Sequence, residues 1–166
     1  MKTVKMLSLD TASRDSGWAY WENAVLKDHG VIHVPEKIKE PTAKLDCMVE
    51  GLIKLLKDKN PDIVVIEMTV VPNNTGTQRI LSEIVGVVRG WCYSQKKNVD
   101  FIRLRPTEWR KLVREKTEKV PKSKKDGLKQ WDIKKAKELY HFKPIDDNEA
   151  DGVLLGHAYK RLFGLK

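Results

Sequence analysis

The chain has 166 residues, 40% of them hydrophobic, and a formal net charge of +9. This length and composition predict a single soluble globular domain, residues 1–166, with one sizeable core. The longest apolar runs, such as residues 63–66, are too short to span a membrane, and no signal-peptide pattern precedes the first strand. Cys47 and Cys92 lie in apolar helical patterns, so we expect reduced thiols and a cytoplasmic protein.

The positive charge is concentrated in one part of the chain. Residues 101–143 contain 15 Lys or Arg and 6 Asp or Glu, whereas the remainder contains 17 of each sign. Such a block is often only a solvated surface, but this density also predicts a polyanionic partner. The candidate nucleic-acid contacts in or beside this block are Arg105, Lys122, Lys124, Lys125, Lys129 and Lys134.

Hydrophobic periodicity predicts a mixed α/β sheet with helices on both faces. The first three strands form an antiparallel meander, and strands then alternate with helices, which gives five strands in all. The predicted strands are residues 4–9, 17–22, 25–34, 63–66 and 99–104. The predicted helices are residues 44–59, 78–94, 108–114, 133–140 and 148–162.

Three acidic positions fall at the ends of predicted elements. Asp10 ends the first strand, and Glu67 ends the fourth. If these strands are parallel neighbours, both carboxylates project from the same sheet edge, where open α/β sheets bind ligands. The last helix opens with a third acidic group, in which Asp147, Asn148 and Asp151 share one face because of their helical spacing.

Clustered carboxylates repel one another unless cations lie between them. Oxygen ligands without His or Cys suit Mg²⁺ or Mn²⁺, and two such ions about 4 Å apart stabilise the attacking and leaving oxygens of phosphodiester cleavage. Each acid also has an ordinary explanation: Asp10 as a turn residue, Glu67 as a strand-end charge, and Asp147 as a group favoured by the helix dipole. Their joint occurrence beside a basic segment favours a metal site.

The acidic segments carry a family resemblance. Residues 7–19 (LSLDTASRDSGWA), 63–67 (IVVIE) and 148–152 (NEADG) resemble, in order and spacing, the three signature segments of RuvC-type Holliday-junction resolvases. The resemblance implies a ribonuclease H-like fold, a homodimer, and Mg²⁺-dependent cutting of branched DNA such as four-way junctions and forks. A small lysine-rich chain is similar to the bacteriophage members, which implies the cytoplasm of a bacterium or of a phage-infected host.

The resemblance also implies roles for individual residues. Asp10, Glu67 and Asp151 fall on catalytic metal ligands that hold two Mg²⁺ ions, for which Mn²⁺ substitutes. Asn148 falls where relatives have Asp or His, so the fourth ligand is either Asn148 or the neighbouring Asp147. The family also has a lysine near the active site, expected here within residues 124–134.

The loop after Glu67 lies where some relatives carry an aromatic wedge. Here Val70 and Val71 take that place, so the resemblance does not imply base stacking by an aromatic side chain at the junction. The same loop contains two further candidate DNA contacts, Asn73 and Asn74.

Other functions were weighed against this one. An ordinary ribonuclease H would end its fourth strand with Asp, where this chain has Glu67. Sugar kinases and actin need two such domains, which this length does not supply. Two alternatives stay open: a related nuclease that processes ribosomal RNA precursors, and a non-catalytic DNA-binding module that uses only the basic segment.

The apolar pattern of the helix predicted at residues 78–94 indicates where two subunits would meet. Its apolar residues cover more than one face, so it is either internal or shared with a second subunit. We expect the shared arrangement, with Ile84 and Val88 at the interface.

Overall fold

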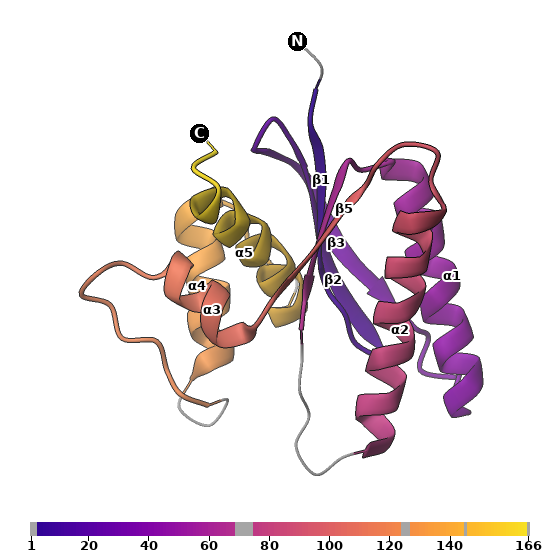
Figure 1. The fold of residues 1–166 in the computed structure, drawn as a ribbon. Helices are drawn as coiled ribbons and strands as arrows, with labels where there is room; N and C mark the ends of the chain where they lie inside the picture. Colours follow the sequence, from indigo (N-terminus) through magenta and orange to yellow (C-terminus); the bar gives the residue numbers. More distant parts are fainter. Residues whose placement is uncertain (1–2, 69–74, 124–126, 145, 166) are drawn as a thin grey trace.

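The computed structural model describes residues 3–68, 75–123, 127–144 and 146–165. A twisted sheet forms the middle layer, with α1 (Pro41–Lys59) and α2 (Thr75–Ser94) on one face (Figure 1). The other face carries α3 (Pro106–Val113), α4 (Leu128–Tyr140) and α5 (Asp147–Leu162). The predicted α/β architecture with helices on both faces is therefore confirmed.

The sheet has five strands in the order β3-β2-β1-β4-β5. The first three strands pair antiparallel as a meander, whereas β4 is parallel to both β1 and β5. This is the predicted mixed sheet with the topology of ribonuclease H-like proteins. The strand bounds are β1 Lys5–Asp10, β2 Asp15–Glu22, β3 Val25–His33, β4 Ile63–Glu67 and β5 Asp100–Leu104.

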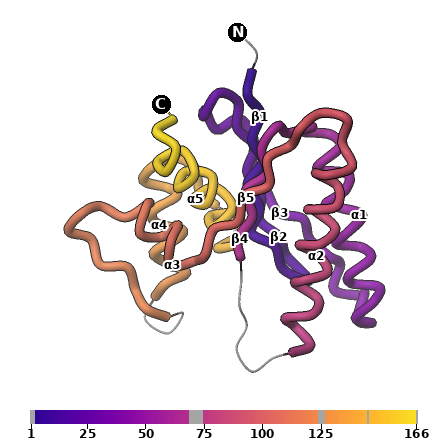
Figure 2. The backbone as a smooth tube through the Cα atoms, viewed as in Figure 1, coloured from indigo at the N-terminus to yellow at the C-terminus, as the bar shows by residue number. Residues whose placement is uncertain are grey.

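All five helices begin earlier than hydrophobic periodicity predicts, by one to five residues. The largest difference is in α4, which begins at Leu128. Helix α2 begins at Thr75 with a polar first turn, which carries no apolar spacing signal. Helix α1 ends at Lys59 and is capped by Asn60, which adopts a left-handed conformation with φ of 43°. After α3 the chain runs outward from the sheet before returning to α4 (Figure 2).

Each sheet face has its own hydrophobic core. The core under α1 and α2 includes Leu7, Leu9, Leu52 and Ile66, and the core under α5 includes Trp21 and Trp109. These side chains separate because successive residues of a strand point to opposite faces.

The predicted interface positions on α2 are wrong. Ile84 and Val88 are both 0% exposed and belong to the core that α2 shares with α1 and the sheet. The extra apolar arc of this helix is used inside the chain, which is the internal arrangement that the pattern also allowed. The outward side of α2 instead carries Tyr93, which is 75% exposed, and Gly86 and Gly90, around which a side chain would meet open space.

Two simpler expectations concern thiols and membranes. Cys47 and Cys92 are free cysteines, as expected, and burial raises the pKa of the Cys92 thiol to about 11. In the part of the chain that the structure describes, no helix is both long and apolar enough to cross a bilayer.

Candidate active site

Asp10 and Glu67 end two parallel strands that lie side by side. Leu9 of β1 pairs with Ile66 of β4, so the next residue of each strand lies at the same edge of the sheet. Alternation then directs both acids to the α5 face. On that face Ser8, two residues before Asp10, donates a hydrogen bond from Oγ to the α5 backbone at 2.7 Å.

Helix α5 reaches this edge because small residues let its backbone approach the sheet. A Cβ on Gly17 of β2 would lie 1.6 Å from the carbonyl oxygen of Asn148, and a Cβ on Gly152 would lie 2.8 Å from the Gly17 backbone. Asp146 caps the N-terminus of α5, and its Oδ1 accepts a hydrogen bond from the Glu149 N–H at 3.0 Å. The close approach at Gly17 and Gly152 brings the first turns of α5 against the ends of β1 and β4.

The acids on these elements share one electrostatic environment. Desolvation, and then the charges of Glu67 and Asp147, raise the pKa of Asp10 well above its ordinary value. Desolvation and the charges of Asp10 and Asp132 raise the pKa of Asp151 in the same way. Such mutual repulsion marks a site that favours added positive charge.

Two residues of α3 contact the acids directly. Trp109 donates from Nε1 to Oε2 of Glu67 at 2.6 Å. Arg110 donates from Nη2 to Oδ2 of Asp151 at 3.2 Å, and it forms two further hydrogen bonds with Asp132 of α4, at 3.1 and 3.0 Å. Trp109, Arg110 and Asp132 lie in no sequence motif that predicts a site.

One signal in the sequence pointed towards this network. Asp132 lies between Trp131 and Ile133 in a basic helix, and an acid beside apolar residues needs a partner if it is buried. Its partner lies 22 residues earlier in the chain, so only the tertiary fold identifies it.

The two candidates for a fourth ligand have different surroundings. The side-chain amide of Asn148 donates to Oδ2 of Asp146 at 3.4 Å. Asp147 raises the pKa of both Asp10 and Asp132 by its charge, and its Oδ2 lies 2.5 Å from Nζ of Lys129. Asp147 is therefore the residue that interacts electrostatically with the acids of the sheet edge.

The donor atoms suit a hard cation. They are carboxylate oxygens, and Oδ1 of Asp151 is buried with no hydrogen-bond partner in the described part of the chain. Within those same residues, no three His, Cys, Asp or Glu side chains lie close enough together to hold a metal ion as they stand. The oxygen donors therefore match the preference of Mg²⁺ or Mn²⁺. The acids, however, are not drawn together around a single point.

A basic groove lies beside the cluster. It has a volume of about 360 Å³ and lies between α3 and a second wall formed by Val120, Pro121, Lys122 and Leu128. Arg110 belongs both to this groove and to the acid network. The other cations that line the groove are Lys111, Arg114 and Lys122.

The remaining predicted DNA contacts are scattered. Arg105 is exposed immediately before α3, and Lys129 is paired with Asp147. Lys134 is 76% exposed, and its Nζ lies 3.7 Å from Glu138. Of the described lysines within residues 124–134, Lys129 is the one that contacts an acid of the cluster. The positions outside the described residues are Val70, Val71, Asn73, Asn74, Lys124 and Lys125.

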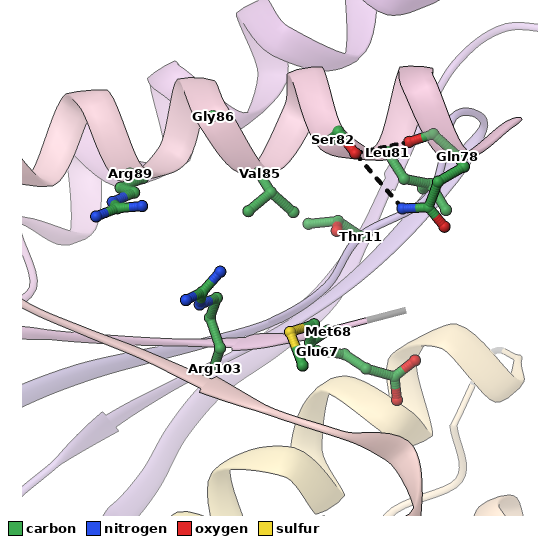
Figure 3. Close-up of a pocket in the computed structure, with 10 residues that line it drawn as sticks. All are labelled: Thr11, Glu67, Met68, Gln78, Leu81, Ser82, Val85, Gly86, Arg89 and Arg103. Carbon is green, nitrogen blue, oxygen red and sulfur yellow. Dashed lines mark hydrogen bonds between the residues drawn. The ribbon is translucent and has the colours of Figure 1, made fainter. Parts of the chain in front are cut away.

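A second cavity, of about 390 Å³, lies on the opposite side of the sheet edge. Figure 3 shows Thr11, Arg89 and Arg103 around it, with the carboxylate of Glu67 pointing away towards α5. This cavity is therefore separate from the acid cluster, although Glu67 contributes to its wall.

Comparisons with known proteins reveal the fold. No protein-family model matches the sequence, and no curated protein matches it either. Among solved structures, Thermus thermophilus RuvC in complex with a Holliday junction superposes with a TM-score of 0.68 at 10% identity, covering 98% of this chain and 97% of that one.

Two further solved structures are similar over nearly the whole chain. A Fowlpox virus resolvase, in complex with Holliday-junction DNA, gives a TM-score of 0.60 at 18% identity, covering 98% of this chain and all of that one. The yeast mitochondrial Holliday-junction resolvase gives 0.61 at 12% identity, covering 98% of this chain and 82% of that one. The chain therefore has the fold of the RuvC-type Holliday-junction resolvases.

Proposed function

We propose that the protein is a Mg²⁺-dependent, structure-selective endodeoxyribonuclease that cuts four-way junctions and other branched DNA. The observation that carries this proposal is the convergence of Asp10, Glu67 and Asp151 at one sheet edge, in a fold that solved junction resolvases share. A cluster of acids that raise one another's pKa would repel DNA unless cations bind there.

The acids would hold two cations, with Mn²⁺ able to replace Mg²⁺. Asp10, Glu67 and Asp151 are the proposed ligands, with either Asp147, whose charge acts on Asp10, or Asn148 as the fourth. The ions would supply the activation of water and the stabilisation of the leaving oxygen. The chain itself orients Glu67 through the Trp109 indole N–H.

Branched DNA would approach through the basic groove next to the acids. Arg114 and Lys122 line this groove beside Arg110, so a strand lying there would pass directly from phosphate-binding cations to the acids. We propose that Arg105, Lys122, Lys129 and Lys134 contact DNA phosphates, together with four residues outside the described ranges: Asn73, Asn74, Lys124 and Lys125.

Symmetric resolution of a four-way junction needs two cuts on opposed strands, and one site in each chain therefore implies a homodimer. Because Ile84 and Val88 are buried, we assign the contact to the outward side of α2, where Tyr93 is 75% exposed beside Gly86 and Gly90. The proposed location is the cytoplasm of a bacterium or of a phage-infected host.

The test is incubation with Mg²⁺ and three labelled substrates: a four-way junction, a linear duplex and a structured RNA. Paired cuts in the junction, with the duplex left intact, are the expected result. Preferential cutting of the RNA would replace the proposal with a nuclease that processes ribosomal RNA precursors. Tight junction binding without cleavage in Mg²⁺ or Mn²⁺ would indicate a DNA-binding module.

A further inference from the structure

The network around Arg110 contains more fixed charge than the proposed reaction uses. The Asp132 residue is 1% exposed, and its carboxylate accepts two parallel hydrogen bonds from the Arg110 guanidinium, from Nε at 3.1 Å and from Nη2 at 3.0 Å. This is the two-pronged arrangement in which a guanidinium and a carboxylate hold each other's orientation. Asp132 is not one of the proposed cation ligands, so its burial calls for another role.

The rest of the guanidinium is held as well. Its central carbon lies 4.1 Å from the centroid of the Trp109 ring, and the Arg110 side chain is only 14% exposed. With Asp132 and the ring fixing the group, Nη2 donates to Oδ2 of Asp151 at 3.2 Å. Arg110 thus has one orientation, and that orientation selects one oxygen of Asp151.

The other oxygen of Asp151 is left without a partner. Oδ1 is buried and receives no hydrogen bond from a donor within the described residues, although the Asp132 carboxyl lies within hydrogen-bond reach of the Asp151 carboxyl. A buried carboxylate oxygen without a donor is costly, and the acids Asp10 and Glu67 beside it make a cation the natural partner. The two oxygens of one carboxylate therefore face different groups.

We propose that Arg110, anchored by Asp132, is a positioning residue for the cation site: it fixes Asp151 through Oδ2 and thereby presents Oδ1 to the cation. This inference rests on the cation site of the proposed function and adds two residues to it. Groups that orient a metal ligand in this way typically contribute 10–100-fold in metal affinity or activity.

The geometry predicts that lysine cannot replace Arg110. A guanidinium can donate to both oxygens of Asp132 and also to Asp151, because its N–H groups are fixed in one plane. An ammonium group at the end of a flexible stem cannot hold both carboxylates in fixed orientations. Arg110→Lys keeps the positive charge but loses the planar set of donors. This variant therefore separates the positioning of Asp151 from simple neutralisation of the acids.

The experiment measures Mn²⁺ binding to the DNA-free protein by titration calorimetry, with junction cleavage measured in parallel. We expect Arg110→Lys and Asp132→Asn each to weaken Mn²⁺ binding about 10–100-fold. Arg103→Gln is the control, because this exposed arginine lies at the cavity on the other side of the sheet. Its Mn²⁺ affinity should equal that of the unmodified chain.

A buried unpaired charge can unfold a protein, so a paired variant is needed. Arg110→Gln combined with Asp132→Asn removes both charges together, and melting curves establish that it folds. If the folded double variant binds Mn²⁺ as tightly as the unmodified chain, the pair only stabilises the fold and the inference is overturned. Tighter binding in any Arg110 variant would also overturn it, because Arg110 would then be a competitor of the cation.

The outcomes also separate this inference from the proposed function. Weaker Mn²⁺ binding in the variants, with no cleavage of branched DNA by the unmodified chain, supports the positioning role and refutes the nuclease. Cleavage by the unmodified chain, with equal Mn²⁺ affinity in all folded variants, supports the nuclease and refutes the positioning role. Absence of Mn²⁺ binding to the unmodified chain overturns both.

Discussion

The two faces of the sheet are packed in different ways. Under α1 and α2 the core is made of aliphatic and aromatic side chains such as Leu7, Leu52 and Ile66. Under α3, α4 and α5 the core also holds the buried charged residues of the described chain: Glu67, Asp132, Lys135 and Glu149. One face is thus held by apolar contact, while the other combines apolar contact with charges in fixed positions.

The difference shows how a fold prepares one side of a sheet for chemistry. On the α5 face each buried charge has a specific partner, as in the 2.7 Å contacts of Lys135 with Glu118 and of Glu149 with His29. Charges so buried are tolerated only when they are paired. The pairs also fix orientation, which a site for phosphodiester chemistry needs and an apolar core does not provide.

The largest expected effect is loss of junction cleavage, without loss of junction binding, when an acid on the α5 face is changed. Asp10→Asn or Glu67→Gln should lower the junction-cleavage rate at least about a thousandfold, because the acids of one site act as a unit. Junction binding should be unchanged or tighter, since a negative charge near phosphate is removed. Gel shifts and cleavage assays on the same samples measure both, and a tenfold loss of affinity would contradict the assignment.

The next effect compares one glycine on each face. Gly17→Ala should lower the free energy of unfolding by about 3 kcal/mol, because the new Cβ would meet the backbone carbonyl of Asn148, which cannot move aside. Gly51→Ala on α1 is the matched change. Its Cβ would lie 2.7 Å from the Cγ2 methyl of Ile32, a half-buried side chain on the edge strand β3 that must move as a whole, and alanine favours the helix by about 0.5–1 kcal/mol.

Urea denaturation of both variants checks this pair of expectations. Gly51→Ala should stay within about 1 kcal/mol of the unmodified chain. Equal destabilisation by the two changes would mean that the close approach of α5 is no more demanding than that of α1.

The fold could be predicted from the sequence because strand alternation and helical periodicity are local signals. Leu7 and Leu9 point to one core and Ser8 to the other, so the placing of Asp10 at the strand end follows from the pattern. The Arg110–Asp132 pair could not be predicted, because it joins two helices whose packing is set by the whole α5 face. The prediction that Ile84 and Val88 lie at a subunit interface was wrong for a related reason. A wide apolar arc on a helix does not distinguish a neighbouring helix of the same chain from a second subunit.

A pH effect on stability should arise on the α5 face. Nδ1 of His157 lies 2.6 Å from the Tyr140 hydroxyl oxygen, within hydrogen-bond distance. Burial, with the charges of Lys160, Arg161 and Lys135, lowers the pKa of His157 from 6.5 to about 4. The unfolded chain therefore binds more protons than the folded chain between these two values. Stability from this group is complete above about pH 6.5 and is lost as the pH falls towards 4.

The size of this effect is about 2 kcal/mol, after allowance for partial solvent exposure. The measurement is the free energy of unfolding at pH 7.5 and at pH 4 for the unmodified chain and for His157→Gln. The unmodified chain should lose about 2 kcal/mol more than the variant over this range. Parallel losses would show that His157 titrates at its ordinary pKa in the folded protein.

The smallest effect concerns the basic groove at the outer side of the α5 face. Arg114 and Lys122 line this groove, and each phosphate that they neutralise should contribute about −0.9 to the slope of log affinity against log salt. Arg114→Gln combined with Lys122→Gln should therefore flatten the slope for junction binding by about 1.8. The matched control, Lys54→Gln with Lys57→Gln on α1, removes the same charge from exposed positions on the other face and should leave the slope unchanged. If both pairs flatten the slope equally, DNA responds only to net charge, and the groove has no special place in binding.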